Sequence, residues 1–120
     1  MEIKIANKNY QLYFGWDFLE KINQEFGIKV DVDGQEINTR TGGLAFLNVG
    51  LEAYDPIAVQ KAIQAATNTA PSKPSIVNIR KFIEDKIIKD LDGYKELTNE
   101  LASEIKKDPM LKALDKLTNK

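Results

Sequence analysis

The fold class is decided by residues 75–90, SIVNIRKFIEDKIIKD. Its apolar residues recur every three or four positions, which is the spacing of one helix face, and charged residues fill most positions between them. The stripe consists of Ile76, Ile79, Ile83 and Ile87, joined by Phe82. Ser75 precedes it and can cap a helix, because its hydroxyl can accept a hydrogen bond from an early amide. The stretch therefore predicts an amphipathic helix that packs against other helices.

The same spacing continues on both sides of this helix. We predict that residues 41–117 are helical, except for a loop at 67–74 where prolines and serine supply turn chemistry. Asp55-Pro56 and Asp108-Pro109 each place a capping residue before a first-turn proline, so each starts a new helix. An alanine-rich face after Pro56 leaves room for another helix to approach closely.

Residues 1–40 predict two β-hairpins with a helix between them. Alternating apolar residues on either side of Asn7-Lys8-Asn9 indicate the first hairpin, and Asp33-Gly34 is a strong tight-turn pair for the second. The intervening helix should end at Gly27, which we expect to be a left-handed C-cap. The second hairpin either pairs with the first or projects to a partner.

The predicted fold is therefore mostly α with a small β part (α+β). β-Hairpin elements at the N-terminus are followed by a helical bundle of about five to six helices. A chain of 120 residues can bury one core of ordinary size but not two independent ones. We expect a single domain spanning residues 1–120.

Composition excludes most catalytic chemistry. The chain has no cysteine and no histidine, which removes thiolate nucleophiles, the usual general base near neutral pH and the commonest transition-metal ligand. Asp31, Asp33 and Glu36 surround Gly34, but their spacing is not that of a calcium-binding loop, and a hairpin turn explains them better. We predict no enzymatic activity, no cofactor and no metal site.

Charge and hydropathy argue against nucleic-acid and membrane partners. Seventeen basic and eighteen acidic residues give a formal net charge of -1, which does not favour a polyanion. No apolar run approaches the roughly 18 residues needed to cross a bilayer, and the N-terminus lacks the pattern of a signal peptide. We expect the protein to remain in the cytoplasm.

Two groups of apolar residues are candidates for protein binding. Tyr13 and Trp16 belong to an aromatic cluster, completed by Tyr10, Phe14 and Phe18, that should mostly form core. Strand alternation nevertheless turns Tyr13 away from Leu12, and aromatic residues dominate interface hot spots. The second group is a stripe near the C-terminus: Met110, Leu111, Leu114 and Leu117. This stripe either closes the core of the monomer or docks into a groove of a neighbour.

Three segments, taken in order, resemble the tail assembly chaperones of long-tailed (siphovirus-type) bacteriophages of Gram-positive hosts. They are the start MEIKIANKNYQLYFG, the helix DFLEKINQEFG and the stretch TRTGGL that leads into helices. The resemblance covers nearly the whole chain, and it lies in the order of segments rather than in a catalytic motif.

The resemblance implies a non-enzymatic protein that coats the tape measure protein during tail morphogenesis and is absent from the mature virion. In that family a programmed ribosomal frameshift commonly yields a longer form with an added C-terminal domain, so this chain would be the short form and the longer one a further partner. Coating a long partner favours a homo-oligomer, either a spiral or a ring. The alternatives are a structural tail or connector protein of the virion and, less favoured by the charge balance, a small helical DNA-binding regulator.

Overall fold

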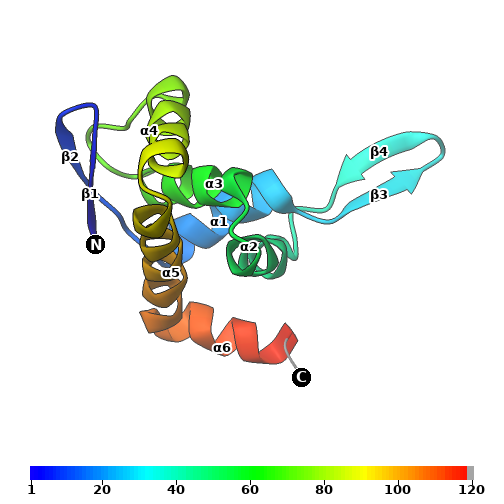
Figure 1. The fold of residues 1–120 in the computed structure, drawn as a ribbon. Helices are drawn as coiled ribbons and strands as arrows, with labels where there is room; N and C mark the ends of the chain where they lie inside the picture. Colours follow the sequence, from blue (N-terminus) through cyan, green and yellow to red (C-terminus); the bar gives the residue numbers. More distant parts are fainter. Residues whose placement is uncertain (119–120) are drawn as a thin grey trace.

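The computed structural model describes residues 1–118, which contain six helices and two separate antiparallel hairpins (Figure 1). The strands are β1 (Glu2–Ile5), β2 (Lys8–Gln11), β3 (Lys29–Val32) and β4 (Gln35–Asn38). The helices are α1 (Trp16–Phe26), α2 (Gly43–Glu52), α3 (Pro56–Ala66), α4 (Ile76–Lys89), α5 (Leu91–Lys107) and α6 (Pro109–Thr118). This confirms the predicted α+β class, with small hairpins in the N-terminal part and a helical remainder.

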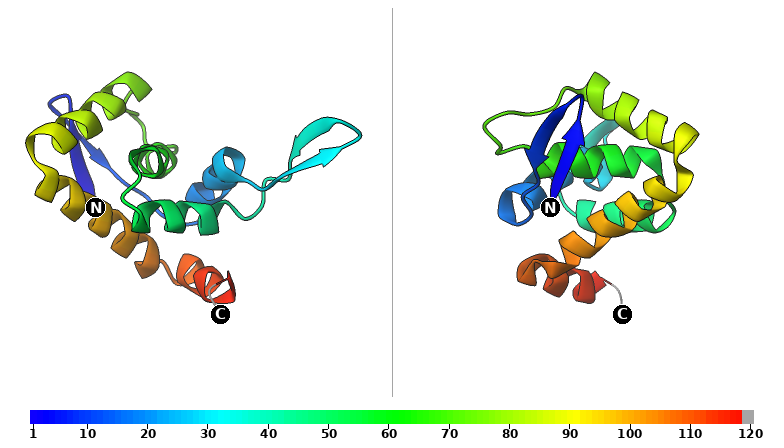
Figure 2. Two further views of the ribbon diagram at one scale, coloured as in Figure 1. Left: turned by 45° about the vertical axis from the view of Figure 1, so that its right-hand side comes forward. Right: turned by 60° about the vertical axis from the view of Figure 1, so that its left-hand side comes forward.

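The six helices form one body. Helices α1, α2 and α3 pack against one another, α5 crosses α2, α3 and α4, and α6 lies against α5 and α2 (Figures 1 and 2). All six helices and the β1–β2 hairpin contribute buried side chains to one hydrophobic cluster. Its large, fully buried members include Ile5, Phe18, Ile22, Leu47, Ile63, Ile79, Leu101, Ile105 and Leu111.

The β1–β2 hairpin covers one end of the body, where β1 contacts α4. Its turn is Ala6-Asn7 rather than the predicted Asn7-Lys8-Asn9, because Ile5 pairs directly with Lys8. Both turn residues have positive φ angles, 51° and 65°, as a two-residue turn that matches the twist of the strands requires. The register places Ile3 beside Tyr10, and both side chains are buried in the core.

Helix starts follow the predicted capping residues. The Asp55 carboxylate accepts a hydrogen bond from the Ile57 amide (3.0 Å) before α3. The Ser75 hydroxyl accepts one from the Asn78 amide (3.1 Å) before α4. The sequence alone locates these starts because each bond joins residues two or three positions apart.

The end of α1 differs from the prediction. Gly27 was expected to be a left-handed C-cap, but its φ and ψ are -55° and 148°, so the chain leaves the helix directly in an extended conformation. The Asn38 side-chain amide donates to the Gln24 carbonyl (2.9 Å) and thereby satisfies the helix end from the far strand of the second hairpin. A Cβ at Gly27 would collide with the Asn38 side chain and the Asn23 carbonyl, so glycine is required here for close packing rather than for a left-handed turn.

Candidate protein-binding surfaces

The second hairpin extends from the body as an arm, defined here as residues 28–39 (Figures 1 and 2). Its turn is Asp33-Gly34, as predicted, with φ angles of 53° and 82°. It forms its own two-stranded sheet and does not pair with β1–β2, so it projects from the body. That it projects to a partner stays a prediction.

The arm is amphipathic, and its apolar face is not covered by the body. Val30 lies opposite Ile37, so these two side chains share a face with Val32, and all three are exposed. The other face carries charged residues, among them Lys29 and Glu36, whose Nζ and Oε1 atoms are 3.5 Å apart. An exposed apolar face on a thin ribbon is typical of a contact surface for another molecule.

The base of the arm is fixed to the body. The Ile28 amide donates to the Thr41 carbonyl (2.7 Å), and the Thr39 amide donates to the Ile28 carbonyl (2.8 Å). The Ile28 side chain lies over Gly42, where a Cβ would come within 2.7 Å of it. The Gly43 amide at the start of α2 donates to the Asn23 side chain (2.8 Å), so the first amide of this helix already has a hydrogen-bond partner within the protein. Gly42 and Gly43 lack side chains where Ile28 and Asn23 approach closely, so these glycines allow close packing.

The two predicted aromatic contact residues both lie on the surface. Tyr13 is 50% exposed, although its amide is anchored by a bond to the Ala66 carbonyl (2.8 Å), and Trp16 is 71% exposed at the first position of α1. Phe14 and Phe18, from the same cluster, pack together with ring centroids 5.0 Å apart. The cluster therefore divides into a packed half and an exposed half that is available to a partner.

The C-terminal stripe divides in a similar way. Leu111 is fully buried, Met110 and Leu114 are half-buried against the core, and Leu117 is 68% exposed. The Asp108 carboxylate caps the helix by accepting from the Leu111 amide (2.9 Å). The beginning of α6 thus closes the core, whereas Leu114 and Leu117 border an open hollow of about 270 Å³ between α1, α2 and α6.

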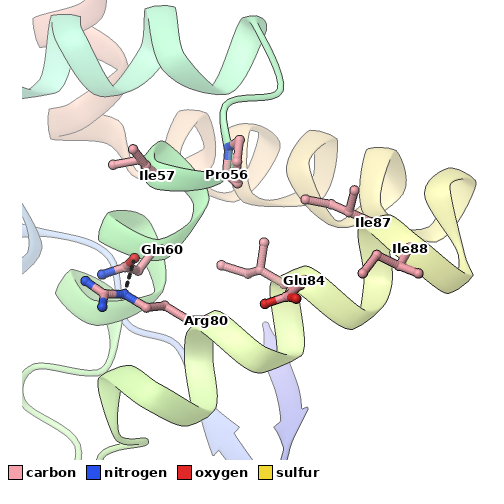
Figure 3. A pocket seen from close by; sticks show the side chains of 8 residues that line it. Pro56, Ile57, Gln60, Arg80, Glu84, Ile87 and Ile88 are labelled. Atoms are coloured by element: carbon pink, nitrogen blue, oxygen red, sulfur yellow. Dashed lines mark hydrogen bonds between the residues drawn. The ribbon is translucent and has the colours of Figure 1, made fainter.

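An apolar groove of about 250 Å³ runs between α3 and α4 (Figure 3). Pro56 and Ile57 form its α3 side, and Ile83, Ile87 and Ile88 form its α4 side. Ile57 and Ile88 are 59% and 70% exposed. The groove is smaller than the 300–1,000 Å³ typical of sites for drug-sized ligands, so its size suits a few side chains of another protein.

One polar pair closes an end of this groove. The Arg80 Nε donates to the Gln60 Oε1 at 3.2 Å, and Glu84 lies one helical turn further along α4 (Figure 3). An apolar floor with charged groups at its edge is the usual composition of a protein contact surface.

Sequence reasoning did not single out the groove, although a signal was present. Ile87 and Ile88 are consecutive on a helix and cannot both face the core, so one of them had to be exposed. In α2, apolar residues occur around the whole helix, and Phe46 and Val49 are exposed as a result. An excess of apolar residues over what one helix face requires is therefore the signal that could have found these surfaces.

A family model described as phage tail assembly chaperone protein, TAC, matches residues 2–118. The chain belongs to this family. No curated protein and no solved structure matches it significantly. Membership in this family supports a non-enzymatic role in phage tail assembly, and it confirms the resemblance to phage tail assembly chaperones.

The buried polar groups of this tail assembly chaperone form hydrogen bonds within its fold. In the described part of the chain, no buried side-chain nitrogen or oxygen lacks a hydrogen-bond partner. Burial raises the pKa of Tyr94, whose hydroxyl donates to the Tyr54 carbonyl (2.7 Å). The hydrogen bond from Lys61, at 2.9 Å, lowers the pKa of Glu25 and ties α3 to α1. Both shifts have structural causes, burial for Tyr94 and the hydrogen bond from Lys61 for Glu25.

Residues 1–118 contain no cluster of metal ligands and no membrane-spanning helix. No group of three or more acidic side chains there is arranged to hold a metal ion. No helix in that range is long and apolar enough to cross a membrane. Which of the exposed apolar surfaces bind a partner stays a prediction.

Proposed function

We propose that this tail assembly chaperone binds and coats the tape measure protein of a siphovirus-type phage of a Gram-positive host, and that it self-associates along this client. It acts in the host cytoplasm and is absent from the mature virion. A longer, frameshifted form of the chain is a second partner. The observation that carries the proposal is the distribution of exposed apolar side chains over separate elements of a member of this family.

This distribution suits an extended client better than a compact one. Exposed large apolar residues occur on the arm, before and at the start of α1, on α2, on α3 and α4, and at the end of α6. A long chain with apolar segments can be covered by many such contacts, each modest in area, without one deep pocket. Trp16 and Leu117 offer two exposed apolar anchors on the body for this purpose.

Co-expression with the large tail gene product tests the proposal. We expect the tape measure protein to be insoluble alone and soluble with the chaperone, because coating would shield its apolar segments. Trp16→Ser should reduce the soluble fraction, since this side chain is 71% exposed and contributes little to the fold. Lys95→Ala, at an exposed position of α5, is the matched control and should leave the soluble fraction unchanged. A client that stays insoluble although both proteins are well expressed would contradict the proposal.

Purified virions separate the proposal from the structural alternative. A chaperone that leaves before maturation should be missing from mature particles when their proteins are quantified by mass spectrometry. A tail or connector protein would be found there in fixed ratio to the tube subunits. Peptides from a longer product that shares this N-terminal sequence, sought in infected cells, would support the frameshifted partner.

A further inference from the structure

The arm needs a partner for physical reasons. A two-stranded hairpin is only marginally stable in water, and packing of one face normally stabilises it. Val30, Val32 and Ile37 stay exposed on that face, and the contacts of the arm with the body are confined to its base. Something outside this chain is expected to cover the face.

The same chain carries a surface that could cover it. The groove between α3 and α4 has an apolar floor of five side chains and a volume of about 250 Å³. The arm projects from one side of the body, whereas α4 lies on the opposite side in two views (Figures 1 and 2). An arm therefore cannot reach the groove of its own chain, but it can reach that of a second copy.

Charge favours a second copy as the occupant. The arm carries one lysine and three acidic residues, so its formal net charge is -2. Helix α4 forms one wall of the groove. It carries four basic and two acidic residues, so its formal net charge is +2. Within the groove itself Arg80 and Glu84 balance, and the remaining charged residues of α4 lie outside it. The opposite net charges of the arm and α4 therefore act over a distance: they speed the encounter and disfavour contact between two arms.

We propose that the arm of one copy seats its apolar face in the α3–α4 groove of the next copy. This inference rests on the proposed self-association and assigns the two surfaces that make it. Because the two surfaces are different and lie on opposite sides, each added copy offers a new free arm or groove. Such a head-to-tail contact produces an open spiral, or a ring where the rotation closes.

Three sets of purified variants test this contact by sedimentation velocity over a range of protein concentrations. Val30→Thr with Ile37→Thr keeps strand propensity and makes two of the three side chains on the apolar face of the arm polar. Ile57→Gln with Ile88→Gln makes the groove polar at two exposed helix positions. Val49→Gln is the matched control, because Val49 is 65% exposed on α2 and lies outside both surfaces.

We expect the wild-type chain and the Val49 variant to assemble alike, and each double variant to associate about tenfold more weakly or not at all. Melting temperatures that match wild type at the lowest protein concentration, where self-association contributes least, would show that the variants are folded. The decisive sample is an equimolar mixture of the two double variants, which retains one intact arm and one intact groove. It should form heterodimers and nothing larger.

Four results would overturn the inference. They are a wild-type chain that stays monomeric at high concentration, double variants that assemble like wild type, a Val49 variant that is weakened equally, and a mixture without heterodimers. The client is not present in these samples, so failure here would leave the co-expression test of the proposed function untouched. Conversely, an arm variant that assembles normally but no longer solubilises the client would show that the arm binds the client instead.

Discussion

The two leucines on α6 provide a direct test of how the C-terminal stripe is used. Leu111→Ala removes three carbon atoms from a side chain that is fully buried, whereas Leu117→Ala shortens one that is 68% exposed. Truncation of a buried leucine costs about 2.7–5 kcal/mol, because the transfer energy is lost and a cavity remains. Truncation of an exposed residue usually changes stability by less than about 0.5 kcal/mol. We therefore expect a difference of about 3 kcal/mol between the two variants.

Urea denaturation followed by circular dichroism measures this difference. It should be repeated at several protein concentrations, because self-association stabilises the folded state by mass action. Hydrogen exchange adds a local reading: in the Leu111 variant the amides of α6 should lose protection first, since this helix is held mainly by one buried side chain. If Leu111→Ala unfolds within about 0.5 kcal/mol of wild type, α6 does not close the core of the monomer in solution, and docking into a neighbour becomes the better account.

Three further predictions concern the fold. Gly27→Ala forces a Cβ against the far strand of the arm and should cost about 1–3 kcal/mol, measured by urea denaturation. Gly50→Ala puts a Cβ 2.6 Å from the Ala58 Cβ, where α2 and α3 meet. The overpacking should outweigh the gain in helix propensity, so the free energy of unfolding should fall by about 1 kcal/mol and the melting temperature should fall with it. Lys61→Met removes the hydrogen bond that holds the pKa of Glu25 below its ordinary 4.5. A lowered pKa stabilises the folded state only where the carboxylate is ionised. The variant should therefore lose about 0.5 kcal/mol of unfolding free energy near neutral pH, and this loss should vanish as acid titrates Glu25.

Local signals explain why most elements could be predicted from the sequence. The caps at Asp55 and Ser75, the turn at Asp33-Gly34 and the isoleucine stripe of α4 all depend on residues within a few positions of one another. Gly27 was predicted wrongly because its role depends on Asn38, eleven positions away, which satisfies the end of α1 across the base of the arm.

The candidate surfaces were only partly predictable for the same reason. Strand alternation identified Tyr13, but the exposure of Ile57 and Ile88 depends on how α3 and α4 cross, which no short spacing reveals. The spacing of the stripe on α6 could not decide whether it closes the core of the monomer or docks into a neighbour, because all four residues fall on one helix face. Burial separates Leu111 from Leu117 only once the neighbours α2 and α5 are in place.

The size of the proposed contact has a consequence for how a coat would form and come apart. The apolar face of one arm offers about three side chains, and interfaces of this kind belong to the small, weak class. Each arm–groove contact would be reversible alone, but neighbouring copies bound to one long client would be held at a high effective concentration and would reinforce one another. The coat would then form on the client and separate readily once the client is taken over by the tail tube. A much stronger contact would keep the copies assembled after the client has left, so this mechanism requires an association of the purified chain that is weak and depends on protein concentration.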